Sequence, residues 1–446
     1  MGVRNRWVIL VLGVLIVAVS LSAQQAKPPY STVEYNDYTA ALNEQDPQAR
    51  LRLLGDFLEK YPESALRPFV FQIYLQSYQQ RSNWPKVIEF ADKLLTLDPA
   101  LVEKVYKRPG QTAEQVKQQV ALLTYQTLSL RARAFLSFED KSPQADAAAE
   151  KAARLAQDGL QRLERIGRPQ NLTPEKFAEV KKQEAAVFHT VLGNVAFRKK
   201  DYDTAAREYK VVVQQDPSNA FYTYRLGISY LQTTQPQYLP GFWTVARAVA
   251  LFPDNQRKSV RDFLVSKLRT YQGYADLCPV RHAEKQADIL IVRAKNSLTP
   301  PSTWALLNAE HVMAVRNDLT PKRIFDELKA GGEQQQLIWL ASCGMELPDV
   351  PGKVLEVTNS DDNLVTLRLA VGQEAADANI ANVEVKVTEP PEAKNLKPGD
   401  IVRVTAVLTD YQSEPFLLQL TEGQVNPEDI PKGRRSAPRR RSRSSR

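Results

Sequence analysis

The sequence has few of the residues that most often carry out chemistry. It contains two cysteines and three histidines in 446 residues. Transition metals are usually held by several histidine and cysteine side chains, and a cysteine nucleophile needs a histidine and an orienting group beside it. Cys278 and His282 lie four residues apart, but no third group accompanies them. The composition therefore argues against a metal site and against a thiol enzyme.

Sequence motifs of other enzyme classes are also missing. The chain has no glycine-rich phosphate loop, no nucleophile elbow and no paired-carboxylate motif. The dipeptide Glu310-His311 has no second histidine or carboxylate at ligand spacing. We therefore expect a non-enzymatic protein with no catalytic residues, no cofactor and no metal.

The net charge of +8 comes from the C-terminal end of the chain. Residues 432–446 include Lys432, seven arginines and no acidic residue; without these and Arg4 and Arg6, 49 basic residues face 51 acidic ones. We expect residues 426–446 to form a disordered basic tail, because so polar a segment has no core to bury. Such a tail either aids solubility or makes weak, salt-sensitive contacts with anionic lipid or polysaccharide. Its candidate polyanion-binding residues are Arg434, Arg435, Arg439, Arg440, Arg441, Arg443 and Arg446.

Residues 1–23 have the organisation of a secretory signal. Two arginines precede an apolar run from Trp7 to about Val19, and small residues follow it as far as Ala23. The run is short for a membrane span, which needs about 20 apolar residues. A cleaved signal peptide and an uncleaved anchor both stay open, because Leu21 is a poor residue at the third position before a cut after Ala23. In either case we expect the rest of the chain in the bacterial periplasm or on the outer face of the inner membrane.

Export changes how the two cysteines are interpreted. In an oxidising compartment Cys278 and Cys343 form the one available pair, and a disulfide between them would close a long loop. Such a bond stabilises a fold by about 2 to 5 kcal/mol where the geometry permits it. A disulfide and two unpaired thiols both stay open at this point.

A repeat of 34 residues is present in the middle of the chain. Leu192-Gly193 recurs as Leu226-Gly227, in a period that is typical of units built from two helices and a tight turn. In the first copy Ala205 is the small residue at which the two helices would press together, and Pro217 ends the second helix. The corresponding residues of the second copy are Gly241, Ala248 and Pro253.

These copies resemble the tetratricopeptide repeat, most strongly over residues 186–254. Weaker copies end at prolines 62 and 99. Residues 113–138 and 145–166 have the apolar spacing of two long amphipathic helices of the same general kind. The resemblance implies a helical solenoid over residues 33–275, in which neighbouring helix pairs stack and leave a concave surface.

The resemblance also implies which side chains line that concave surface. In this family they belong to the first helix of each pair, on the face opposite the packed small residues. Amides and aromatic rings there suit an extended peptide, because amides bond its backbone and rings contact its apolar side chains. The alternative is that the apolar members pack against neighbouring helices. The candidate partner-binding residues are Gln72, Gln76, Gln79, Thr190, Asn194, Phe197, Arg198, Phe221, Tyr224, Leu231 and Gln232.

From Pro351 onward the apolar period changes to two. Five short segments rich in Val, Leu and Thr are separated by turn-forming residues, which predicts a small closed barrel over residues 351–425. The ending LKPGDIVRVTAVLTDYQSEPFLLQLTEG resembles the oligonucleotide/oligosaccharide-binding (OB) barrel. Residues 276–350 contain Pro-Pro and Gly-Gly breaks, and we expect short connecting helices there. The expected fold is mainly α, a solenoid followed by an OB-like five-stranded β-barrel.

The predicted barrel lacks the features of a nucleic-acid groove. Single-strand binders of this fold combine a basic groove with aromatic stacking platforms. The predicted strands within residues 352–421 contain two aromatic residues, Tyr411 and Phe416, and four scattered bases, which are Lys353, Arg368, Lys386 and Arg403. We therefore expect no specific nucleic-acid binding and a structural or interaction role, with sugar or peptide binding as the alternative.

These expectations define two candidate functions. The first is an exported scaffold for protein-protein interaction, whose concave face binds a peptide or partner protein in the cell envelope. The second is a binder of envelope polyanion or polysaccharide that acts through the barrel and the basic tail.

Overall fold

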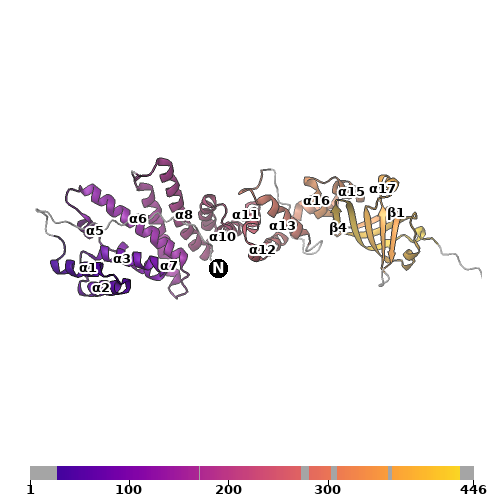
Figure 1. Ribbon diagram of the computed structural model, residues 1–446. Coiled ribbons are helices and arrows are strands. Elements are labelled where there is room, and N and C mark those ends of the chain that lie inside the picture. Colours follow the sequence, from indigo (N-terminus) through magenta and orange to yellow (C-terminus); the bar gives the residue numbers. More distant parts are fainter. Residues whose placement is uncertain (1–27, 170, 273–280, 303–308, 360–363, 432–446) are drawn as a thin grey trace, which may run out of the picture. The chain divides into compact units, whose positions relative to one another are not determined.

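The protein is mainly α-helical and ends in a closed five-stranded β-barrel, as the sequence predicts (Figure 1). The computed structural model describes residues 28–169, 171–272, 281–302, 309–359 and 364–431. The chain divides into two compact units, residues 1–200 and residues 201–446, which are called the N-terminal and C-terminal units. Within the described ranges, no helix is both long and apolar enough to cross a membrane. The predicted signal of residues 1–23 and the arginines after Lys432 lie outside these ranges.

Successive helices pack against one another in the N-terminal unit. Several of them begin at a capping side chain followed by a proline, as at Asp46-Pro47 and Thr173-Pro174, where the fixed proline φ suits the first helical turn. Pro99 likewise begins a helix, after the preceding one has ended at Leu95. The helices are α1 (Thr32–Asn43), α2 (Pro47–Lys60), α3 (Arg67–Gln80), α4 (Trp84–Leu95), α5 (Pro99–Tyr106), α6 (Ala113–Ser137), α7 (Ala145–Arg165) and α8 (Pro174–Arg198).

Aromatic residues fill the core of the N-terminal unit. The rings of Tyr74 on α3 and Phe90 on α4 stack with their centroids 4.1 Å apart. Phe188 on α8 is fully buried and lies against Gly159 on α7, where a Cβ atom would come within 2.4 Å of the ring. A glycine is therefore required on α7 at the closest approach of these two long helices.

Five more helices open the C-terminal unit. They are α9 (Tyr202–Gln215), α10 (Ala220–Gln232), α11 (Tyr238–Leu251), α12 (Asp254–Gln272) and α13 (Arg281–Ala294). Pro217 and Pro253 follow the ends of α9 and α11, as predicted. Apolar residues of α13, including Ala287 and Leu290, share one core with α11 and α12. The helical packing therefore continues to Ala294, beyond the boundary predicted at residue 275.

The barrel has the strand order β1-β2-β3-β5-β4 and closes through β1, which pairs with both β2 and β4. Strands β3 and β5 run parallel, and the other pairs are antiparallel. Inward-facing Val and Leu alternate with outward-facing polar residues, which is the pattern of a barrel with a filled interior. The elements are β1 (Glu346–Asn359), β2 (Val365–Ala370), α17 (Gln373–Ala378), β3 (Val383–Glu389), η1 (Pro391–Asn395), β4 (Ile401–Ser413), β5 (Phe416–Val425) and η2 (Pro427–Asp429).

Short helices complete the core of the barrel. Ile324 and Leu328 of α15 (Pro321–Ala330) are buried in the same cluster as the inward-facing strand residues. Trp339 of α16 (Glu333–Ser342) contacts the ring of Tyr411 on β4, with centroids 4.9 Å apart. The sequence had placed these helices, with α14 (Ala309–Asn317), in a separate connecting region. They belong instead to the barrel, whose first strand begins five residues earlier than predicted.

Candidate functional site

Three glutamines of the predicted concave surface lie along α3. On one side of this helix Val70, Phe71 and Tyr74 are buried in the core, and the opposite side faces solvent. Gln76 and Gln79 are exposed, so their amides are accessible to a partner. Gln72 is half-buried, and its amide donates to the Pro68 carbonyl oxygen at 3.2 Å and to the Tyr106 hydroxyl. The exposed part of this stretch is therefore Gln76 and Gln79.

The predicted residues on α8 divide between core and surface. Thr190 is buried, and its hydroxyl donates to the Ala186 carbonyl oxygen at 2.7 Å. Its assignment as a partner-binding residue is therefore wrong, because it belongs to the helix core. Asn194 and Phe197 are half-buried, whereas Arg198 is exposed at the C-terminal end of the helix.

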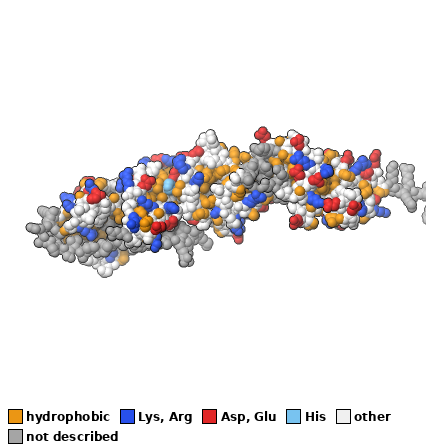
Figure 2. All heavy atoms as spheres, turned by 90° about the horizontal axis from the view of Figure 1, so that it is seen from above, with side chains coloured by type: hydrophobic (Ala, Val, Ile, Leu, Met, Phe, Trp, Pro, Cys, Tyr) orange, Lys and Arg blue, Asp and Glu red, His pale blue; other side chains and the backbone are white. Residues whose placement is uncertain are grey.

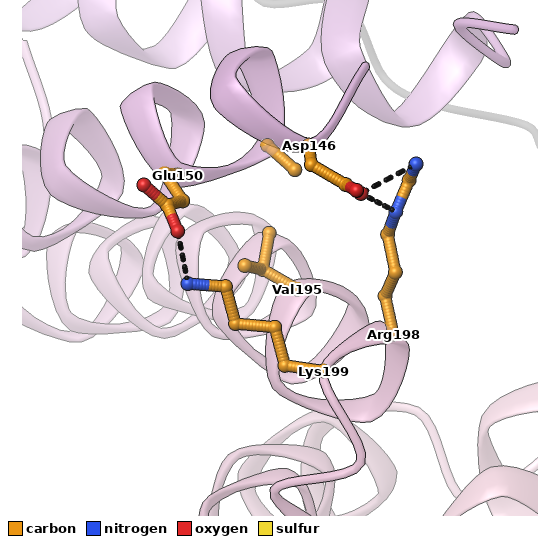
Figure 3. Close-up of a pocket in the computed structure, with 6 residues that line it drawn as sticks. Asp146, Glu150, Val195, Arg198 and Lys199 are labelled. Carbon is orange, nitrogen blue, oxygen red and sulfur yellow. Dashed lines mark hydrogen bonds and ion pairs between the residues drawn. The ribbon is translucent and has the colours of Figure 1, made fainter. Parts of the chain in front are cut away.

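Arg198 already has a carboxylate partner. Its Nε and Nη2 both lie 2.7 Å from Oδ1 of Asp146 on α7 (Figure 3). One residue later, Lys199 Nζ lies 2.6 Å from Oε1 of Glu150, and this hydrogen bond lowers the pKa of that carboxyl. A partner's carboxylate would therefore have to displace Asp146 before it could bind Arg198. All four charged groups are exposed, so such ion pairs contribute little stability and exchange readily.

These two ion pairs border a pocket of about 250 Å³ between α7 and α8. Figure 3 shows Val195 between the two cationic side chains, and Ala149 completes the apolar part of the lining. Sequence reasoning missed Asp146 and Glu150, because it considered only the first helix of the recognised repeat. The sequence feature that could have identified these two residues is their spacing of four in the first turns of α7, which puts both carboxylates on one face of the helix.

Phe221 is the most exposed aromatic residue of the predicted surface. It lies in the first turn of α10, and 46% of its area is accessible. The guanidinium of Arg225 lies 4.5 Å from the ring centroid, in a cation–π contact, and the Tyr222 ring meets Phe221 edge-on at 5.2 Å. Arg225 Nη1 also donates to the Tyr209 hydroxyl at 3.0 Å. The exposed ring is therefore held in position before any partner arrives.

The other predicted partner-binding residues of α10 differ in how deeply they are buried. Tyr224 packs edge-on against Phe252 and Phe263, at 6.2 and 5.6 Å, and burial raises its pKa. Leu231 is buried beside Gly241 of α11, so its assignment to the surface is wrong as well. Gln232, the next residue, is exposed. Of the predicted partner-binding residues on this helix, Phe221 and Gln232 are thus the exposed ones.

The remaining candidates add no chemistry to this surface. No group of histidine, cysteine and acidic side chains able to hold a metal ion occurs among the residues that the structure describes. Cys343 is buried and disulfide-bonded. Cys278, its predicted partner, lies outside the described residues, as do the arginines of the tail, whose role stays a prediction.

No family model matches the chain, and no curated protein matches it. Function is therefore inferred from the exposed side chains of the two units.

Proposed function

We propose that this protein is a non-enzymatic interaction scaffold of the bacterial envelope that binds an extended peptide segment of a partner protein through its helical solenoid. The observation that carries the proposal is Phe221, an exposed aromatic ring held in place by Arg225 on the first helix of a pair. The resemblance to tetratricopeptide repeats supports it, because such repeats present the first helix of each pair to a ligand.

The exposed side chains suit recognition of an extended peptide. On α10, the Gln232 amide offers two donors and an acceptor, which match the alternating N–H and C=O groups of a peptide backbone. Phe221 offers a large, pre-positioned apolar surface for one partner side chain at a low cost in conformational entropy. Because Arg198 is already paired with Asp146, the proposed mode of binding needs no free C-terminal carboxylate.

Removing the accessible side chains together tests this function. The full chain should enrich binders from a phage-displayed library of random dodecapeptides. We expect the variant with Phe221 and Gln232 of α10 replaced by Ala to bind those peptides at least about tenfold more weakly, because loss of one buried aromatic anchor alone costs about 2 kcal/mol. Since both side chains are exposed, the thermal unfolding midpoint should stay nearly unchanged.

The matched control replaces Gln214 and Tyr238 of the same unit by Ala. These residues are also exposed, and Tyr238 has 41% of its area accessible. The control should retain peptide binding. Equal loss in both variants, or full retention in the first, would contradict the assignment of this surface.

Export is the second part of the proposed function. It rests on the arginine-flanked apolar run of residues 1–23. A reporter enzyme that is active only outside the cytoplasm, fused after Pro29, should be active, and deletion of residues 7–19 should abolish that activity. A fusion that is active only with a cytoplasmic reporter would refute export.

Polyanion binding is a weaker second candidate, and the tail alone supports it. Residues 432–446 contain eight basic residues and no acidic one. The barrel does not contribute to this function, because residues 346–431 contain sixteen acidic residues and six basic ones, a net charge of −10 that repels polyanions.

A further inference from the structure

The charge of the barrel and the charge of the segment that follows it are opposite and nearly equal. Residues 346–431 have a net charge of −10, and residues 432–446 have a net charge of +8. The whole-chain value of +8 conceals this contrast. Figure 2 shows acidic side chains dispersed over the surface of the barrel, with basic ones between them.

Four exposed carboxylates lie on neighbouring rows of the outer face of the sheet. The first row runs across four strands. Asp349 of β1 donates its backbone N–H to the Thr405 hydroxyl of β4. Thr405 is the register partner of Gln424 on β5, and Gln424 is in turn the register partner of Glu389 on β3. In the adjacent row, Glu346 of β1 pairs with Val407, which pairs with Thr421, the residue before Glu422. We call Glu346, Asp349, Glu389 and Glu422 the acidic face.

The acidic face has no ion pairs of its own among the described residues, although the charge of Arg403 attracts that of Asp349. None of its four carboxylates forms an ion pair in the ranges that the structure describes, although the neighbouring strands do contain such pairs. Arg368, for example, lies 3.8 Å from Glu356 and 4.0 Å from Glu384. Negative charge therefore exceeds positive charge on this outer surface of the sheet, which favours a cationic occupant.

The described chain ends beside this face. Asp429 of η2 accepts from Nε and Nη2 of Arg403, both at 3.0 Å, and from the Arg403 backbone N–H at 2.9 Å. Ile430 is buried in the barrel core. These contacts fix the last residues before the tail against β4, where Arg403 lies two residues from Thr405, whose hydroxyl accepts from the backbone N–H of Asp349 in the acidic face.

Tethering makes the basic segment an effective occupant of the acidic face. A domain of this size has a radius of gyration of about 12 Å, whereas fifteen residues reach at most about 50 Å when extended. A tether of this length gives an effective concentration on the order of millimolar, which is enough for a weak electrostatic contact to form. We propose that residues 432–446 bind the acidic face of their own barrel, so that the positive charge of the tail and the negative charge of the acidic face mask one another. Since the contact is electrostatic, salt weakens it, and external polyanions compete with the barrel for the tail.

Tryptic release of the tail, followed by intact mass spectrometry of the full chain, tests this inference. The test variant replaces Glu346, Glu389 and Glu422 by Gln and Asp349 by Asn, and circular dichroism confirms its folding. At about 20 mM salt its tail should be cleaved roughly five-fold faster than that of the native chain, because the tail is no longer held. At about 500 mM salt the two rates should be equal, because charges are then screened within a few ångströms.

The control variant undergoes the same change in net charge in the N-terminal unit. It replaces the exposed residues Asp56 by Asn and Glu59, Glu114 and Glu164 by Gln. Its tail should be cleaved at the native rate. Equal cleavage rates for all three proteins at low salt, or equal acceleration in both variants, would overturn the inference. Acceleration that depends on protein concentration would also overturn it, because the contact would then join separate chains. None of these outcomes depends on peptide binding by the solenoid.

Discussion

Replacing Asp92 by Asn is expected to lower the free energy of unfolding of the N-terminal unit by about 3 kcal/mol. Asp92 on α4 lies 3.0 Å from Nε of Arg131 on α6, and only 2% of the Arg131 side chain is exposed. Lys151 on α7 approaches the second carboxylate oxygen at 2.8 Å. Nη1 of Arg131 is buried without a hydrogen-bond partner. Loss of the Asp92 charge would therefore leave a buried guanidinium with no counter-ion.

Glu89 on the same helix provides the control. It also bridges two bases, Lys86 and Lys93, each at 2.7 Å, but all three side chains are well exposed. Glu89→Gln should therefore cost less than about 1 kcal/mol. Native-state hydrogen exchange of α4 and α6 amides measures both variants, since it reports on one unit of a two-unit chain. Equal effects of the two substitutions would contradict the role given to Asp92.

A double substitution separates the buried charge from a general packing defect. In the Asp92→Asn background, Arg131→Met should recover most of the lost stability, because the uncompensated charge disappears while the side chain still fills the space. If Arg131→Met does not recover stability, the Asp92 carboxylate does not stabilise the N-terminal unit by neutralising the Arg131 charge.

The sequence predicted the barrel strands well because their burial alternates. Inward-facing residues of β2 and β3 are Val and Leu at every second position, and both strands lie within the barrel predicted over residues 351–425. Strand β1 begins before the barrel boundary predicted at residue 351. Its first half contains Pro348 and Pro351, which weaken a strand pattern, and an irregular register against β4 lies between Leu347 and Val350.

The predicted surface residues were less reliable, because one helix does not show what covers its flanks. Phe221 and Leu231 are both apolar residues at predicted concave positions of α10, yet the first is exposed and the second is buried under α11. Helical periodicity gives the direction of a side chain, whereas its burial depends on the neighbouring helix. The contact of Arg225 with Phe221 was open to prediction from their spacing of four residues. The pairing of Arg198 with Asp146 was not, because 52 residues separate them.

Replacing Gly227 by Ala is expected to destabilise the C-terminal unit by about 2 kcal/mol, although Ala is the better helix former by about 1 kcal/mol. Gly227 is the central small residue of the second repeat. A Cβ atom there would lie 2.6 Å from Cγ2 and 2.8 Å from the backbone N of Val245 on α11, and 3.2 Å from the Gly241 carbonyl oxygen. Val245 is fully buried and its backbone is helical, so the two helices would have to move apart.

Gly55→Ala is the matched control for this substitution. Gly55 also lies inside a helix, α2, but its nearest neighbour would be the Tyr74 hydroxyl oxygen at an ordinary 3.4 Å. The control should be neutral or stabilising by up to about 1 kcal/mol, because only the helix propensity changes. Hydrogen exchange in α10 and α11 for the first variant, and in α2 for the second, measures the two effects. If Gly227→Ala proves as harmless as Gly55→Ala, the close approach of α10 and α11 does not stabilise the repeat. If instead protection is lost throughout α10, the ring of Phe221 should lose its fixed position, and peptide binding should weaken together with the packing of the helix pair.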